Sequence, residues 1–83
     1  MEQFVFTLSD GVPALDEDRF ELADVTAARN EAARVLSEAL KTHAREFWRD
    51  GRLVLTVSDE RGLVLFSIYV DAIASAATGQ PGH

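Results

Sequence analysis

The densest group of side chains that could do chemistry is an acidic run near the N-terminus. Asp16, Glu17 and Asp18 are consecutive, and their carboxylates could bind Ca²⁺. An EF-hand loop counted from Asp16 needs glycine at its sixth position and glutamate at its twelfth, but these positions hold Glu21 and Ala27. We therefore expect a solvated acidic loop, and leave open whether it binds a cation weakly.

The other reactive side chains lack the partners that catalysis requires. The acidic run could supply a carboxylate pair for hydrolysis, but nothing around it promises the burial that separates an acid from a base. His43 falls in an apolar helical pattern, where a core-edge side chain is expected, and the other histidine is His83. With no cysteine, the chain has no thiolate catalysis and no Cys-type zinc site. We expect no catalytic residue, no metal and no cofactor, and therefore not an enzyme.

Positive charge gathers on one predicted helix. Arg34, Lys41, Arg45 and Arg49 lie away from its apolar residues and are interleaved with glutamates. This basic face could contact nucleic acid, and a nucleic-acid-associated regulator is the alternative function that we retain. The net charge of −6 argues against it, because basic residues provide most of the affinity for phosphate backbones. A solvent-facing helix surface with pairs of opposite charge explains the pattern more simply.

The elements that would position these residues follow from hydrophobic periodicity. Alternating apolar and polar residues predict strands at 3–8, 19–22, 52–58 and 63–70. Apolar residues spaced by three and four predict one long amphipathic helix over residues 25–47. Asp24 is its expected N-cap and Gly51 its expected end. Gly62 is expected at positive φ in the second hairpin loop.

These elements predict an α+β domain with a two-layer ββαββ arrangement. One helix covers one face of a small antiparallel or mixed sheet of about four strands. Length and apolarity place the first and last strands at the centre and residues 19–22 at an edge. Residues 1–72 are predicted to form this single domain, because 83 residues cannot hold two cores. The small residues at 73–83 are expected to form a disordered tail.

The sheet face that the helix leaves open poses a problem for a monomer. That face, together with the helix end, is expected to carry Val5, Val54, Leu63, Leu65, Tyr69 and Trp48. Contiguous exposed apolar surface usually marks an interaction site. We therefore expect a homodimer, or a complex with an unidentified protein partner, through these residues. The alternative is that Trp48, the acidic loop or the C-terminal tail folds over them.

The compartment can also be predicted from the sequence. The chain has no run of about 18 apolar residues that could cross a membrane. Its first residues are strand-like and lack the basic and apolar regions of a secretory signal. Together with the lack of cysteine, these features favour a cytoplasmic protein without a membrane partner.

The order of these features resembles a family of short bacterial proteins that carry a domain of unknown function. The resemblance extends over nearly the whole chain to about Val70. The matching residues are Phe4, Phe6, Asp10-Gly11, Asp16-Glu17, Glu21-Leu22, Asp24, Ala27-Ala28-Arg29, Glu31-Ala32 and Asp59-Glu60-Arg61-Gly62. This sequence departs from the family pattern at Arg19-Phe20, because the family commonly has a glycine at this place. The resemblance implies the fold but no activity, and we expect a non-catalytic interaction or accessory module.

Overall fold

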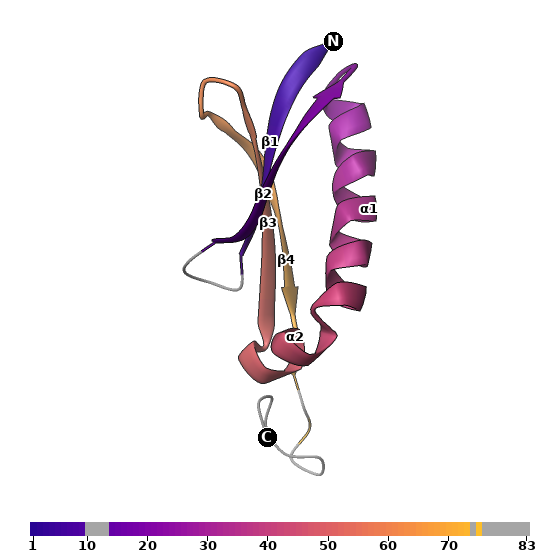
Figure 1. The fold of residues 1–83 in the computed structure, drawn as a ribbon, viewed down its shortest axis with the longest axis vertical. Helices are drawn as coiled ribbons and strands as arrows, with labels where there is room; N and C mark the ends of the chain where they lie inside the picture. Colours follow the sequence, from indigo (N-terminus) through magenta and orange to yellow (C-terminus); the bar gives the residue numbers. More distant parts are fainter. Residues whose placement is uncertain (10–13, 74, 76–83) are drawn as a thin grey trace.

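Over the residues that the structure describes, the chain folds into two β-hairpins that are separated by two helices. The computed structural model describes residues 1–9, 14–73 and 75, with the backbone alone at residues 14 and 15. The elements are β1 (Glu2–Ser9), β2 (Ala14–Leu22), α1 (Val25–Thr42), α2 (Ala44–Asp50), β3 (Arg52–Asp59) and β4 (Val64–Asp71) (Figure 1). The predicted α+β class is confirmed, but the return strand is longer than the predicted 19–22. Asp10-Gly11, which carries part of the family resemblance, and most of the predicted tail lie outside the described residues.

The four strands form one antiparallel sheet in the order β2-β1-β3-β4. β1 lies inside the sheet and β2 at an edge, as predicted, but the prediction that β4 would be central is wrong. The chain crosses from β2 through the helices and pairs β3 with β1, so that Val57 lies opposite Phe6. Because β4 follows through a tight hairpin, it pairs with the remaining free side of β3.

Asp59 organises the turn between β3 and β4. Its Oδ1 accepts hydrogen bonds from the backbone N–H groups of Arg61 at 2.9 Å and Leu63 at 3.0 Å. The bond from Leu63 contributes most to a lowered pKa of the Asp59 carboxyl, and the contacts with Arg61 add to it. Gly62 has a φ of 91°, which confirms the predicted positive φ. The turn is therefore held by a carboxylate and a glycine that the sequence already marks.

Helix α1 begins and packs as its sequence predicts. The Asp24 side chain caps it by accepting a hydrogen bond from the backbone N–H of Ala27 at 2.8 Å. The helix buries the stripe Ala28, Ala32, Leu36 and Ala39. Since three of these four residues are alanines, the helix backbone lies close to the sheet.

The predicted single helix is wrong at its C-terminal part. The backbone leaves helical geometry at His43, with φ −109° and ψ 30°, and α2 begins at the next residue. An eight-residue strand and an 18-residue helix both span about 27 Å. A helix unbroken to Asp50 would span about 39 Å and extend past the sheet. The break instead lets Phe47 pack on the core, and Gly51 ends α2 in the left-handed conformation with φ 78°.

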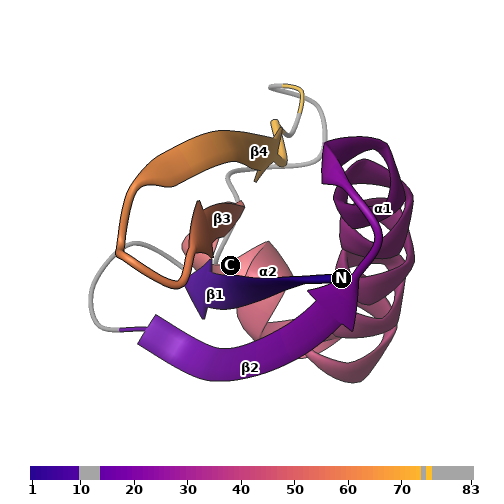
Figure 2. The same ribbon diagram turned by 90° about the horizontal axis from the view of Figure 1, so that it is seen from above.

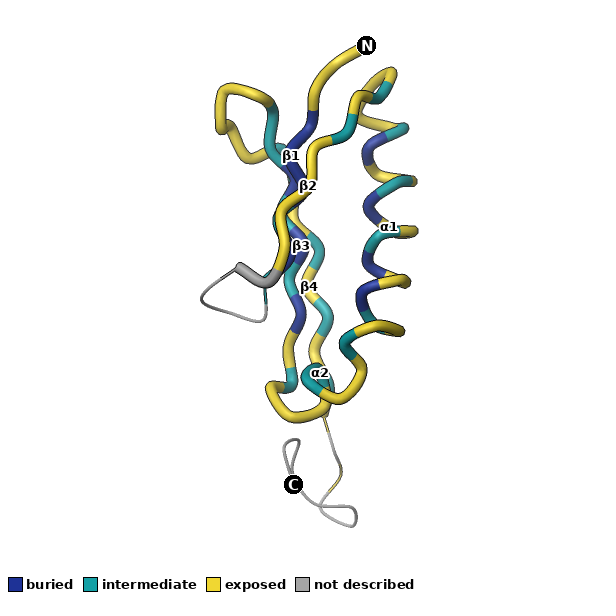
Figure 3. Tube along the Cα trace, viewed as in Figure 1, coloured by how far each residue is buried: buried dark blue, intermediate teal, exposed yellow. Residues whose placement is uncertain are grey.

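The core lies between α1 and the two inner strands. Figure 3 shows buried segments along β1 and β3 and on the side of α1 that faces the sheet. Besides the helix stripe, the core contains Phe4, Phe6, Leu8, Leu53, Leu55 and Val57. Alternate residues of each inner strand supply these side chains, because neighbouring strand residues point to opposite faces of the sheet.

Candidate functional site

One helix layer leaves both edges of this sheet partly uncovered. Four strands are about 19 Å wide in the hydrogen-bonding direction, whereas a helix with its side chains is about 10–12 Å across. Figure 2 shows the sheet curving around α1, with β2 and β4 at its outer positions. On β1 and β3, no residue of the core cluster is more than 5% exposed. The inward apolar residues that the outer strands pack against the core are only half-buried, and they include Phe20, Leu22, Phe66, Ile68 and Val70.

A β-bulge in β4 moves one residue of the predicted interface. Val57 pairs with Phe66 but Ser58 pairs with Val64, so Leu65 is the extra residue. Leu65 is half-buried and packs against the core cluster, whereas simple alternation placed it on the open face. Val64, which simple alternation with Leu65 would place on the core side, is exposed opposite Ser58. The bulge therefore places Leu65, instead of Val64, on the core side of the sheet.

The open face of the sheet is less apolar than the sequence predicts. Val5 is only 9% exposed, and Val54 is half-buried beside Tyr69, which is 63% exposed. Between them the strand register forms a row of hydroxyl side chains, Thr7, Thr56 and Ser67. Ser67 Oγ donates to Thr56 Oγ1 at 3.3 Å. Among the described residues of this face, the apolar side chains are therefore divided by a polar row.

The other two predicted interface residues lie outside the strands. Leu63 is exposed in the turn before β4, and Trp48 is exposed on α2. The Trp48 ring stands edge-on to Phe47, with ring centroids 5.9 Å apart. Phe47 packs on the core, so Trp48 is the member of this aromatic pair whose surface is accessible to a partner. The predicted set is thus brought together in part, with Val54 and Tyr69 as direct neighbours.

At the opposite edge, a groove of about 260 Å³ lies between β2 and α1. Its apolar lining includes Phe6, Phe20, Val35 and Leu55. Its polar lining consists of Asp16, Asp18, Arg34, Glu38, Thr42 and His43. In the part of the chain that the structure describes, no three possible metal ligands converge. The groove therefore combines an apolar surface with separate carboxylates.

The groove unites the acidic run with His43, which the sequence analysis treated as unrelated. Strand pairing explains the placement of two carboxylates, since Asp16 lies opposite Leu8 and Asp18 opposite Phe6, on the helix side of the sheet. The signal in the sequence was the alternation of Asp16, Asp18 and Phe20 along one strand. The predicted strand at 19–22 was too short to include it.

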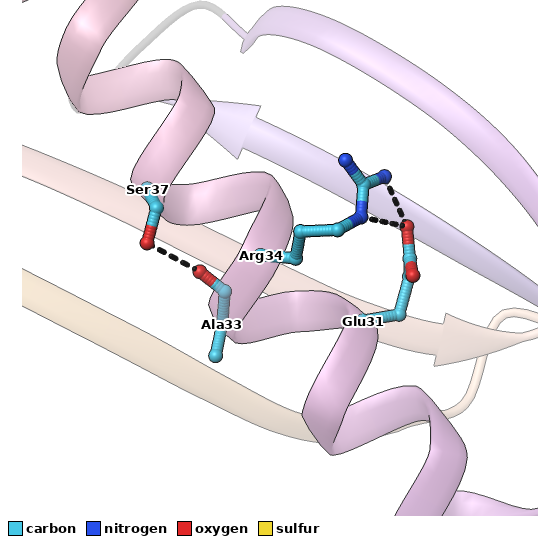
Figure 4. Close-up of polar contacts among 4 residues, drawn as sticks. All are labelled: Glu31, Ala33, Arg34 and Ser37. Atoms are coloured by element: carbon cyan, nitrogen blue, oxygen red, sulfur yellow. Dashed lines mark hydrogen bonds and ion pairs between the residues drawn. The ribbon is translucent and has the colours of Figure 1, made fainter.

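Arg34 lines the groove but is held by its own helix. Its Nε donates to Glu31 Oε2 at 3.0 Å, and its Nη2 donates to the same oxygen (Figure 4). This hydrogen bonding lowers the pKa of the Glu31 carboxyl and raises the pKa of the Arg34 guanidinium. Figure 4 also shows Ser37, whose Oγ donates to the carbonyl of Ala33 at 2.9 Å. The charge of Arg34 is therefore engaged within α1.

The predicted basic face is divided between the two helices. Arg34 and Lys41 belong to α1, whereas Arg45 and Arg49 follow the break and belong to α2. Arg49 Nε also donates to Asp50 Oδ1 at 3.2 Å. A nucleic-acid role for these four residues stays a prediction.

Comparison with protein families places this fold in a known group. The family described as "Domain of unknown function (DUF6894)" matches residues 3–71. The chain belongs to the DUF6894 family. The match runs from β1 to β4 and so includes both uncovered edges. No curated protein and no solved structure matches this DUF6894 domain. Over the described residues, none of its helices has the length and apolar character needed to cross a bilayer.

Proposed function

We propose that this DUF6894 domain is a non-catalytic interaction module that self-associates through its edge strand β4. The observation that carries the proposal is the state of β4, which among the described residues has a neighbouring strand on one side only and has inward side chains that are half-exposed. The free N–H and C=O groups of an exposed edge are a template for another strand. A strand added there would pair with these groups and bury the apolar side chains that α1 leaves uncovered.

The charges of the two edges favour a second copy of the chain on β4. From Val64 to Val70, β4 has no charged residue, although charged side chains commonly protect exposed edges. The opposite edge strand, β2, carries Asp16, Glu17, Asp18 and Glu21 against a single basic residue, Arg19. Two β2 strands would bring two acidic segments together, which opposes their association. Two β4 strands would not.

A two-fold antiparallel pairing of β4 also keeps the side chains of Phe66 to Val70 on their own faces. If Ile68 lies opposite Ile68 of the second copy, Phe66 lies opposite Val70 and Ser67 lies opposite Tyr69. The inward apolar side chains of both copies then extend one continuous core surface. This pairing places Asp71 opposite Leu65, so it brings no like charges together.

The proposal retains two expectations about the setting of the module. The lack of cysteine suits a reducing compartment, so we place the module in the cytoplasm. Tyr69 would lie within the paired strands, and Val54 of β3 would lie beside it on the open face of the sheet. Trp48 of α2 is a further exposed apolar side chain that could extend the contact.

Sedimentation equilibrium of the full chain tests the proposal. At micromolar concentration, we expect a species of twice the 9.1 kDa chain mass. The double variant Ser67→Lys/Tyr69→Lys should be monomeric, because lysines on an edge strand oppose pairing with a second copy. The matched control is Glu17→Lys on the β2 edge, which should leave the dimer intact.

The folded state of each variant must be checked in parallel by circular dichroism. Both substituted side chains of β4 are exposed, so the monomeric variant should keep the helix signal of the wild type. A wild-type chain that sediments only as a monomer would contradict the proposal. So would a β4 variant that remains dimeric.

A further inference from the structure

We propose that the groove between β2 and α1 binds a basic side chain, arginine or lysine, presented by a segment of a partner protein. The aliphatic stem of that side chain would lie on the apolar lining, and its charged head would meet the carboxylates. The site is independent of the proposed dimer, because β2 and β4 are at opposite edges of the sheet.

The apolar lining suits the stem of a long basic side chain. Phe20 is half-buried, and its ring packs on Phe6 with centroids 4.7 Å apart. Val35 of α1 is half-buried on the other side of the groove. Lysine and arginine bury their methylene groups against surfaces of this kind while the charged head remains in water.

The charges around the groove select a cation. Asp16, Asp18 and Glu38 line it, and in the described part of the chain none of them forms an ion pair with a basic side chain. Arg34 also lines the groove, but Glu31 holds its guanidinium (Figure 4), and Glu38 attracts the same guanidinium electrostatically. Asp16 and Asp18 therefore remain available to a ligand, with Glu38 adding to the negative charge of the groove. A guanidinium group can bind such a carboxylate through two parallel hydrogen bonds.

The size of the groove favours a single side chain over a cofactor. Its volume of about 260 Å³ is below the range of about 300–1,000 Å³ that is typical for pockets of drug-sized ligands. The described residues also supply no cluster of metal ligands there. A partner segment that places one basic residue in the groove satisfies both its size and its charge.

The test is an NMR titration of the ¹⁵N-labelled full chain with two acetylated and amidated pentapeptides. One is Gly-Gly-Arg-Gly-Gly, and the other has citrulline, which is neutral and of similar shape, in place of arginine. We expect the arginine peptide to shift the amide signals of Phe20, Val35 and Ala39, and to bind more tightly than the citrulline peptide. Added salt should weaken the binding, because it screens exposed charges.

Matched variants test the role of the carboxylates. Asp18→Asn and Glu38→Gln should each weaken the binding of the arginine peptide by up to about fivefold, the upper end of the range for exposed ion pairs. The control is Glu17→Gln/Glu60→Gln, which removes two negative charges, one more than either test variant, but outside the groove, and it should bind like the wild type. Each variant is compared with the wild type by its amide spectrum, which reports whether the fold is kept.

Three outcomes would overturn the inference. Equal binding of the arginine and citrulline peptides would show that charge does not contribute to binding. Changes in amide signals confined to residues outside the groove would show that the peptide does not bind there. Tighter binding of free 1,4-diaminobutane at the same residues would assign the groove to small amines, and the partner segment would be wrong.

Discussion

At the scale of single residues, a few polar side chains determine where elements begin and turn. Asp24 caps α1 through the N–H of Ala27, and Asp59 accepts two backbone N–H groups in the hairpin turn. Both are short carboxylates beside backbone donors that have no partner in a regular element. Their action is local, so both elements could be located from the sequence.

The lowered pKa of Asp59 predicts a pH dependence of stability. A folded-state pKa below the unfolded value means that the ionised carboxylate stabilises the fold above the unfolded pKa of about 3.9, and that this stability is lost as the pH falls through the folded pKa. Asp59→Ala should therefore unfold at lower urea concentration than the wild type at neutral pH. The difference should shrink in acid. The neighbouring Glu60→Ala serves as the control, and a difference that stays constant into strong acid would rule out this role of the charge.

At the scale of elements, the spacing between α1 and the sheet depends on the alanine stripe. Ala28 and Ala32 are fully buried between the helix and the inner strands, where a larger side chain has no space. The neighbouring Ala33 is exposed on the other side of the same helix. The same substitution at the two positions changes helix propensity equally, but only at Ala32 does it also change the packing against the sheet.

We expect Ala32→Leu to destabilise the domain by about 1–3 kcal/mol, because overpacking forces the helix away from the sheet. Ala33→Leu should change the free energy of unfolding by less than about 0.5 kcal/mol, as is usual for surface substitutions. Urea denaturation of both variants measures the difference. Equal effects at the two positions would show that the helix does not pack through this stripe.

At the scale of the whole molecule, the mismatch between one helix layer and four strands creates two different edges. The β4 edge is neutral and apolar, which favours a second strand, whereas the β2 edge is acidic and forms a groove with α1. The two proposed binding sites thus have one structural cause, and their charges direct them to different partners.

Self-association through β4 makes thermal stability depend on protein concentration. Because the dimer is linked to the folded state by mass action, a tenfold rise in concentration should raise the unfolding midpoint by a few degrees. Ser67→Lys/Tyr69→Lys should have a midpoint that does not change with concentration. Differential scanning calorimetry over two decades of concentration measures both, and a constant midpoint in the wild type would exclude a dimer that stabilises the fold.

The candidate sites were predictable only in part. Tyr69 and Val54 lie side by side on the open face, as strand alternation indicates. Leu65 does not lie on the open face, because the bulge at the Val57/Ser58 step shifts the alternation of inward and outward side chains in β4. Whether a strand contains a bulge depends on its pairing partner as well as on its own residues. The groove was missed for a similar reason, since its two walls come from elements that are distant in sequence.

The sequence by itself determined the local features, which are the Asp24 cap, the buried alanine stripe and the positive φ of Gly62. Each depends on interactions within a few residues along the chain. Tertiary structure decided the strand order, the helix break at His43 and the groove at β2. These depend on whether helix and strand lengths match and on which edge is free after the crossover, and such constraints exist only once the elements pack together.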